Sequence, residues 1–287
     1  MRLVTFSHHG HVRLGAMVSQ GGQEYVLELP GLPANMTEFL NMGETAFAGA
    51  SRAIASADER YLLPAADVTL LAPVPRPGKI ICLGHNYGDH MGKDKTSPDE
   101  YPTFFCKTVN TIVGPGQAIV IPRVTQQVDY EAELAVVIGK RARHVTQERA
   151  FEFVAGYTIF NDVSARDYQK RTSQWMMGKS FDTFGPMGPA LVTTDEIPDP
   201  HDLELALTLN GLEMQRTHTR NMIFTIPYLI AYLSDVMTLE PGDVISTGTP
   251  AKTSLAQSVP PFIKPGDSVR IHIERIGELV NPVVAEA

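Results

Sequence analysis

Short apolar runs with the alternation of half-buried strands follow one another along most of the chain. Beyond residue 78 each run is bounded by Gly, Pro, Asn or Asp. These runs predict strands at 79–84, 102–108, 118–122, 132–139, 157–163, 189–194, 203–211, 243–248 and 268–277. A sheet-rich architecture is therefore expected in this part of the chain.

Two segments have clear helical signals. The run 147–155 follows Thr146, a suitable N-cap, and Gly156 lies just beyond its end. The run 226–237 follows Thr225 and has a proline in its first turn, where proline is tolerated. Many strands with few helices exclude a regular strand–helix alternation, so the predicted fold class is α+β, with mixed β-sheets.

The first 70 residues have a pattern of their own. Alternating runs at 2–6, 11–19 and 24–29, separated by His-Gly and Gly-Gly turns, predict a small β-meander, and short helices are expected from residue 35 and over 44–57. Prolines at 73, 75 and 77 then interrupt the chain. We expect a small β-rich domain over 1–72 and a catalytic domain over 73–287.

Composition narrows the classes of function. Lys and Arg number 24 against 32 Asp and Glu, a net charge of −8, which excludes binding to nucleic acid or to an anionic membrane. The longest apolar stretch, 222–233, is too short to span a bilayer, and the N-terminal residues lack the apolar core of a signal peptide. With only two cysteines, the sequence predicts a cytoplasmic protein without disulfides.

Acidic residues are concentrated in one predicted strand, VDYEAELAVVIG at 128–139. Period-two alternation places Asp129, Glu131 and Glu133 on one face. Carboxylates so close together repel each other and need a cation if they lie near the core. An exposed acidic edge strand is the alternative.

A further carboxylate, Asp162, follows the buried-looking strand at 157–161 and precedes SARD, where Ser164 can cap a helical turn. Together with Glu131 and Glu133 it offers hard oxygen ligands, which suit Mg²⁺, Mn²⁺ or Ca²⁺ and not Zn²⁺. Three ligands leave coordination positions open. An ion held in this way can chelate a 2-oxo acid and polarise its carbonyl group.

Three other stretches offer groups that such a site needs. His90 ends GHNYGDH, in a loop after a predicted strand, where a general base can be presented, whereas His85 is interpreted as a surface histidine. Lys179, in a glycine-bounded segment, can meet a carboxylate or an enolate. Thr249, in a Gly-Thr-Pro loop, can bind an anionic oxygen. Nucleotide binding is excluded because neither GxGxxG nor GxxxxGK[ST] occurs.

Taken in order, these motifs resemble the fumarylacetoacetate hydrolase family in its shorter bacterial form: GHNYGDH, PTFFCK, VDYEAELAVVIGK, GYTIFNDVSARDYQ, GKSFDTFGPMGP, LNGLEMQ and LEPGDVISTGTP. The resemblance covers 77–284. It implies a mixed β-sheet catalytic domain behind a small N-terminal domain, commonly in a homodimer.

The resemblance also implies roles for single residues. It implies a divalent metal, usually Mg²⁺ or Mn²⁺, on Glu131, Glu133 and Asp162. It assigns catalysis to His90 and substrate binding to Lys179, Arg166, Gln169 and Thr249. Lys179 is expected to be catalytic as well, because it can stabilise an enolate.

One position departs from the family pattern. Acylpyruvate-cleaving relatives have a glutamate three residues after the histidine, and the two activate water together. This chain has Lys93 there, and a lysine cannot orient an imidazole as a carboxylate does. Water activation is therefore less well supported by the sequence than metal binding.

Three hypotheses follow. The first is a metal-dependent hydrolase that cleaves a carbon–carbon bond of a 2,4-dioxo acid of the acylpyruvate or fumarylpyruvate type. The second is a tautomerase, isomerase or decarboxylase acting on 2-hydroxymuconate- or oxaloacetate-type dicarboxylates, which the loss of the glutamate favours. The third is a non-catalytic protein that binds a metal and a 2-oxo acid. Selectivity for the far end of the substrate is expected in the polar lid segment 92–100, in the loop 171–177, which contains Trp175, and at Tyr101.

Overall fold

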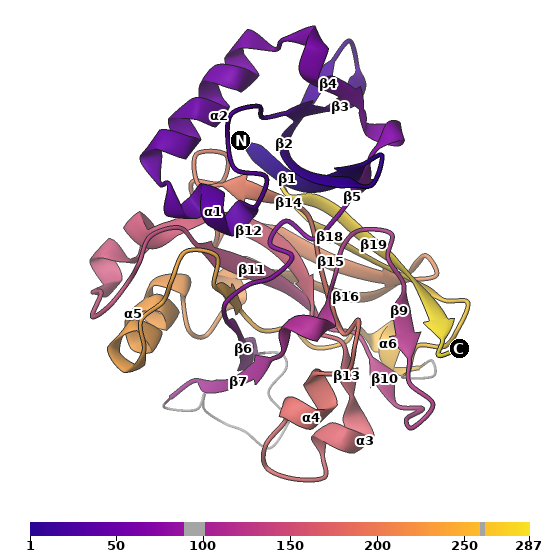
Figure 1. The fold of residues 1–287 in the computed structure, drawn as a ribbon. Helices are drawn as coiled ribbons and strands as arrows, with labels where there is room; N and C mark the ends of the chain where they lie inside the picture. Colours follow the sequence, from indigo (N-terminus) through magenta and orange to yellow (C-terminus); the bar gives the residue numbers. More distant parts are fainter. Residues whose placement is uncertain (89–100, 259–261) are drawn as a thin grey trace.

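Strands dominate the fold in a computed structural model that describes residues 1–88, 101–258 and 262–287 (Figure 1). The helices are few and lie outside the sheets. This arrangement confirms the predicted α+β class with mixed sheets. No helix within these ranges is both long and apolar enough to cross a membrane.

The largest sheet of the described chain joins the N-terminal strands to the rest. Its order is β4-β3-β2-β1-β14-β12-β11-β17-β6-β7, with β5 paired to β1 and β8 paired to β14. The two parts of the chain meet where β1 pairs antiparallel with β14, Leu3 opposite Leu191. The strands are β1 (Arg2–His8), β2 (His11–Gln20), β3 (Gln23–Glu28), β4 (Leu62–Pro64), β5 (Thr69–Leu70), β6 (Ile80–Gly84), β7 (Thr103–Lys107), β8 (Ile112–Val113), β11 (Ala132–Ile138), β12 (Val154–Asn161), β14 (Gly185–Thr193) and β17 (Val244–Ser246).

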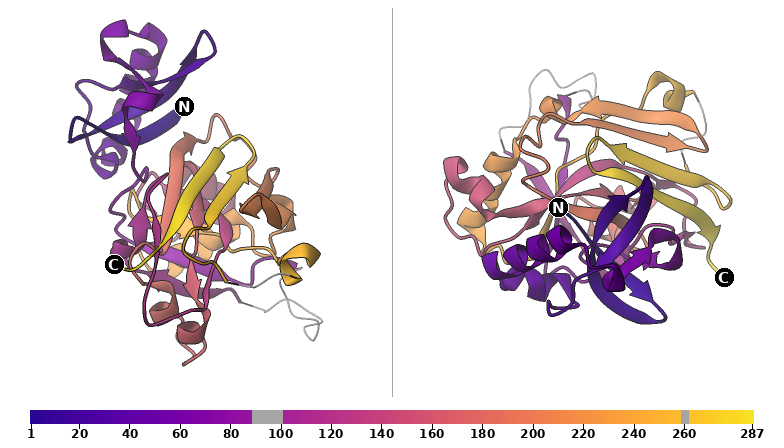
Figure 2. Two further views of the ribbon diagram at one scale, coloured as in Figure 1. Left: turned by 90° about the vertical axis from the view of Figure 1, so that its right-hand side faces the viewer. Right: turned by 90° about the horizontal axis from the view of Figure 1, so that it is seen from above.

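A second sheet has the order β16-β15-β18-β19-β9, and β10 pairs with β13 in a short two-stranded ladder. Its yellow strands β18 and β19 lie side by side in both views of Figure 2. The strands are β9 (Ile119–Ile121), β10 (Val128–Asp129), β13 (Ser164–Ala165), β15 (Glu204–Leu209), β16 (Leu212–His218), β18 (Ser268–Ile273) and β19 (Gly277–Ala285).

The helices agree with the sequence in part. The α-helices are α1 (Met36–Asn41), α2 (Glu44–Ser56), α3 (Arg166–Gln169), α4 (Met176–Lys179), α5 (Ile226–Val236) and α6 (Ser254–Gln257). The 3₁₀ turns are η1 (Glu59–Tyr61), η2 (Ala65–Asp67), η4 (Val109–Thr111), η5 (Gln147–Phe153) and η6 (Thr219–Asn221). The expected helix after Thr225 is therefore confirmed as α5.

Two local predictions were wrong. The expected helix at 147–155 is the 3₁₀ turn η5, because Val154 and the residue after it extend β12, where Val154 pairs with Ile138 of β11. Ser164 does not cap a helical turn: it lies in β13, and its hydroxyl donates to the carbonyl oxygen of Asp162 at 2.9 Å. Ala165 occupies the N-cap position of α3 instead.

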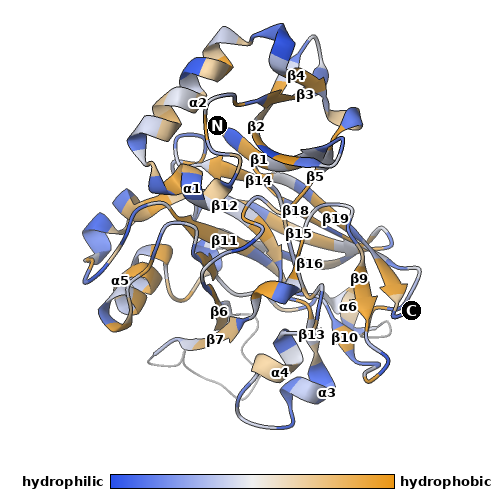
Figure 3. Ribbon diagram, in the orientation of Figure 1, coloured by the Kyte–Doolittle hydropathy of each residue, from blue (hydrophilic) through white to orange (hydrophobic). Residues whose placement is uncertain are grey.

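The central strands β11 and β12 are buried at every position. Alternate side chains of β11 enter different apolar clusters, Leu134 and Val136 on one face and Ala135 and Val137 on the other. The strands at the centre of Figure 3 are accordingly largely hydrophobic. Carboxylates at one end of these strands therefore face the interior, and the acidic edge strand that the sequence left open is excluded.

Candidate metal centre and active site

Three carboxylates meet where β11 and β12 lie side by side. Glu133 is the second residue of β11, Glu131 lies in the link that leads into this strand, and Asp162 directly follows β12. The backbone N–H of Asp162 donates to the carbonyl oxygen of Glu131 at 2.9 Å, which fixes the two segments together. One carboxylate oxygen from each of the three lies within 4.8 Å of the others, and all three residues are buried.

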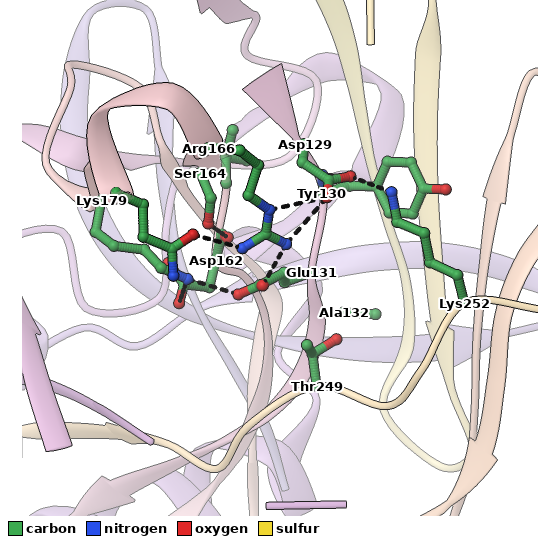
Figure 4. A network of polar contacts seen from close by, with 12 residues as sticks. Asp129, Tyr130, Glu131, Ala132, Asp162, Ser164, Arg166, Lys179, Thr249 and Lys252 are labelled. Carbon is green, nitrogen blue, oxygen red and sulfur yellow. Dashed lines mark hydrogen bonds and ion pairs between the residues drawn. The ribbon is translucent and has the colours of Figure 1, made fainter. Parts of the chain in front are cut away.

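Asp129 does not join this group, although simple alternation placed it on the same face. The strand is interrupted between Asp129, in β10, and Ala132, the first residue of β11. The carboxylate of Asp129 instead accepts from Arg166 Nε at 3.0 Å and from Lys252 Nζ at 2.7 Å (Figure 4). Only Glu131 and Glu133 of the strand motif therefore stand beside Asp162.

Two lysines bind these carboxylates. Lys179 Nζ lies 2.6 Å from Glu131 Oε2 and 2.7 Å from Asp162 Oδ2, and Figure 4 shows it between the two. Lys107 Nζ lies 2.7 Å from Asp162 Oδ1 and donates to the carbonyl oxygen of Val163 at 3.0 Å. Lys179 was predicted for the site, whereas Lys107 was not. The strand PTFFCK could have pointed to Lys107, because period-two alternation places this lysine on the same face as Phe105. A lysine on a buried face needs a carboxylate partner.

Arg166 and Gln169 stand together beside the carboxylates. They are the first and last residues of α3, so one helical turn brings them to the same side, and Arg166 Nη1 donates to Gln169 Oε1 at 2.9 Å. The guanidinium also binds Glu131 Oε1 at 2.5 Å. The positions of both residues next to the acidic triad agree with the expectation from the motif.

Glu133 is held by the segment that follows β17. Its Oε2 accepts from the hydroxyl of Ser246 at 2.5 Å and from the backbone N–H of Gly248 at 3.0 Å. The next residue, Thr249, accepts a hydrogen bond from Gln215 Nε2 at 2.9 Å, so its own hydroxyl proton remains available to donate. The backbone N–H of Gly248 is thus occupied by Glu133, whereas Thr249 lines the cavity beside the triad.

The carboxylates have different electrostatic environments. Burial alone would raise the pKa of Glu131, but the charges of Arg166 and Lys179 outweigh it and lower this pKa below its usual value. Burial, together with the charges of Asp162 and Glu131, raises the pKa of Glu133 well above its usual value. The positive charges of Arg166 and Lys179 therefore balance the charge of Glu131, whereas the charge of Glu133 has no comparable partner.

Both lysines are fully buried, yet their pKa values shift in opposite directions. Burial would lower the pKa of Lys179, but Asp162 and Glu131 raise it above its usual value. For Lys107, burial lowers the pKa despite its contact with Asp162. Lys179 is therefore the firmly charged ammonium group of the site.

A divalent metal ion fits these residues. The donor set consists of carboxylate oxygens, which Mg²⁺, Mn²⁺ and Ca²⁺ prefer. The raised pKa of Glu133 shows that a negative charge there lacks compensation, which an added cation would supply. A cavity of about 40 Å³ beside the triad leaves room for an ion with one or two water molecules.

Residues from several separate segments of the chain surround this cavity. Its lining consists of Leu83, Gly84, His85, Phe105, Glu131, Glu133, Arg166, Gln169, Trp175, Lys179 and Thr249. His85 is exposed, as expected, but it also lines the cavity, a role that the sequence did not suggest. The predicted catalytic His90 and the neighbouring Lys93 lie outside the described residues.

Comparison with known proteins gives a consistent picture. The family model described as "Fumarylacetoacetate (FAA) hydrolase C-terminal" matches residues 79–284. A mitochondrial oxaloacetate tautomerase from Xenopus laevis is 45% identical over 290 residues, which cover 99% of this chain and 90% of that protein.

Solved structures resemble the whole chain. A 5-carboxymethyl-2-hydroxymuconate delta-isomerase from Mycobacterium smegmatis has a TM-score of 0.80 and 38% identity, with 100% of both chains covered. A maleylpyruvate hydrolase from Sphingobium sp. SYK-6, solved with manganese (II) ion and pyruvate, has a TM-score of 0.81 and 34% identity, again with 100% of both chains covered. These similar proteins are named as enzymes of three kinds, a tautomerase, an isomerase and a hydrolase.

Proposed function

The chain belongs to the fumarylacetoacetate hydrolase family, and from this premise we propose that it is a divalent-metal-dependent tautomerase. Its substrate would be a short 2-oxo dicarboxylate of the oxaloacetate type, whose enol and keto forms it interconverts. The reaction moves one proton between the enol oxygen and the neighbouring carbon while a C=O double bond replaces the C=C double bond, and no carbon–carbon bond is cleaved. The choice of tautomerase and of substrate rests on the similarity to the tautomerase from Xenopus laevis.

The observation that carries the enolate chemistry is the position of Lys179. Its ammonium group lies within hydrogen-bond distance of two members of the acidic triad and is held in the charged form by them. A divalent ion on Glu131, Glu133 and Asp162 would supply Lewis acidity for a 2-oxo acid. Lys179 would then stabilise the negative charge that develops on the enolate oxygen.

Other residues of the cavity would bind and orient the substrate. Arg166 presents a guanidinium group for a carboxylate, and Gln169 keeps that group in place through its hydrogen bond. Thr249 would donate its hydroxyl proton to a substrate oxygen. We propose His90 as the group that moves the proton at carbon, because an imidazole can both accept and return it near neutral pH.

Hydrolysis of an acylpyruvate is the second candidate, and the similarity to the maleylpyruvate hydrolase from Sphingobium favours it. It needs an activated water in addition to the enolate-stabilising groups. Lys93 argues against it, since a carboxylate would serve better to orient the histidine. The hydrolase hypothesis remains a prediction, as do Mg²⁺ as the metal, a homodimer and a cytoplasmic location.

The test uses metal-stripped protein and the same protein after addition of Mg²⁺ or Mn²⁺. We expect metal-dependent loss of the enol absorbance of oxaloacetate, with exchange of its C3 protons for deuterium and no enzyme-catalysed release of CO₂. Glu131→Gln should abolish this activity, and Glu152→Gln, an exposed glutamate away from the cavity, should retain it. Release of CO₂ would indicate a decarboxylase, whereas cleavage of acetylpyruvate to pyruvate and acetate would indicate the hydrolase. Tight oxalate binding without any turnover would indicate a non-catalytic protein.

A further inference from the structure

The single tryptophan of the chain packs directly on the backbone at the end of β6. A Cβ atom at Gly84 would lie 2.5 Å and 2.9 Å from two ring atoms of Trp175, closer than such atoms approach each other. Glycine at position 84 therefore permits this contact, and any side chain there would displace the indole. Trp175 is half-buried and immediately precedes α4, the helix that ends at Lys179.

Aromatic contacts connect this indole to the metal centre. Its centroid lies 5.4 Å from that of Phe105 in an edge-to-face arrangement, and 5.5 Å from that of His85. Lys179 Nζ in turn lies 4.7 Å from the centroid of Phe105. The indole therefore has a defined position, set by packing on both sides.

Two spaces meet at Trp175. The inner one is the cavity of about 40 Å³ beside the triad, and the outer one is a groove of about 550 Å³. Arg166, Gln169 and Trp175 line both spaces. Lys170 and Thr172 line only the groove, so a substrate would meet them beyond Trp175.

We propose that Trp175 is a specificity-determining residue that limits the length of the 2-oxo acid. This inference rests on the proposed function, in which the first two carbons of the substrate face the metal centre. In this proposal the remaining carbons point toward Arg166, Gln169 and Trp175, the residues that line both spaces. A four-carbon dicarboxylate places its distal carboxylate near Arg166, whereas a longer chain runs against the indole before it can enter the outer groove.

Binding measurements on the Mg²⁺-loaded protein test the proposal without relying on turnover. The probes are pyruvate, 2-oxoglutarate and 2-oxoadipate, and dissociation constants are measured by calorimetry for the wild type, Trp175→Ala and Trp175→Leu. We expect pyruvate to bind all three proteins within about threefold, because it does not reach residue 175. We expect 2-oxoadipate to bind Trp175→Ala at least roughly tenfold more tightly than the wild type, and Trp175→Leu to show a smaller gain. Met177→Ala, two residues further along in α4, at a position that is 65% exposed and lines neither space, is the matched control.

The outcomes separate the possible failures. Unchanged 2-oxoadipate affinity in variants that still bind pyruvate overturns the length limit. Loss of pyruvate binding in both variants also overturns it, since Trp175 would then serve to position Lys179. If the wild type binds none of the three acids with Mg²⁺, the proposed function itself fails.

Discussion

At the scale of single residues, three acidic side chains of one motif have different environments and therefore different tasks. Glu131 is surrounded by the cations of Arg166 and Lys179, whereas Glu133 has hydrogen bonds from a hydroxyl and a backbone N–H. Asp129 lies outside the triad and binds Nε and Nη2 of the same guanidinium. The two glutamates would both contact a metal, but only Glu133 needs one to balance its charge.

Glu133→Gln tests this difference. The glutamine keeps an oxygen for Ser246 and Gly248 but removes the charge, so we expect metal affinity to fall at least roughly tenfold. In EDTA the variant should be more stable than the wild type at pH 8, because its neighbours disfavour the ionised carboxylate. The pKa of Glu133 is raised in the fold, so its stabilising contribution is present at low pH and declines as the pH rises.

The stability gap between variant and wild type should therefore widen from pH 5 to pH 8, measured by thermal unfolding in EDTA. Glu24→Gln, at an exposed position of β3, is the control. A variant that melts below the wild type at pH 8 would contradict the proposed charge imbalance.

Asp129 provides a second prediction at this scale. Its carboxylate holds Arg166 Nε at 3.0 Å and Lys252 Nζ at 2.7 Å, so it is a positioning residue for a group that binds substrate. Asp129→Asn should raise KM for oxaloacetate roughly tenfold and leave kcat within about threefold, since Arg166 binds the substrate and does not react. Asp167→Asn, whose carboxylate accepts from Thr125 away from the cavity, is the control. A lower kcat with unchanged KM would assign Asp129 to the chemistry instead.

At the scale of elements, the sequence predicted the positions of the strands better than it predicted the caps of the helices or the partners of buried charged residues. The runs around β11 and β12 are apolar enough to identify buried strands at once. Period-two alternation brought Glu131 and Glu133 to one face but placed Asp129 there wrongly, and Asp162 was found because it follows the end of a strand. The strand β19 was missed although its side chains alternate in burial, because Pro282 interrupts the pattern, and this proline is exposed in the structure. Lys107 was missed because its partner Asp162 is 55 residues away, and sequence alone does not show which charges meet.

Helix α5 owes its start to a histidine from another segment. Thr225 occupies the N-cap position without a side-chain hydrogen bond, and the N–H of Ile226 donates to His201 Nε2 at 3.1 Å. Burial lowers the pKa of His201, although Asp199 opposes the shift, so the neutral imidazole is the form that caps the helix. The contribution to stability is then complete above the unfolded pKa of about 6.5 and declines as the pH falls below it.

His201→Gln should therefore cost roughly 1 kcal/mol in the free energy of unfolding at pH 7.5 and less at pH 5.5. Urea unfolding at the two pH values measures the difference, and His272→Gln, at an exposed position of β18, is the control. An equal cost at both pH values would exclude the neutral imidazole as the titrating cap.

At the scale of the whole molecule, the sequence predicts two domains, whereas one sheet of the structure runs through both parts of the chain. The prolines after residue 72 predict a boundary, yet β1 extends the same sheet as β14, and Leu3 belongs to an apolar cluster that also contains Val137 and Leu191. A domain boundary is predicted from local features, namely composition and loop residues. A shared core depends on contacts between segments almost 200 residues apart, which these local features do not show. We propose that the boundary near residue 72 separates segments that nevertheless unfold together.

Leu3→Ala tests this coupling, because Leu3 is completely buried between the two segments. Removal of a buried leucine side chain costs about 2–5 kcal/mol, and a shared core transmits that loss to the whole molecule. Trp175, the only tryptophan, lies in the metal-site region and reports on the catalytic segment, while far-ultraviolet circular dichroism reports on all strands. We expect Leu3→Ala to lower both urea midpoints by the same amount, so that the two curves still coincide.

The control is Val12→Ala, because Val12 is an exposed residue of β2 and tests for effects on the meander alone. If Leu3→Ala shifts the dichroism curve but leaves the tryptophan midpoint unchanged, residues 1–72 unfold independently of the rest of the chain.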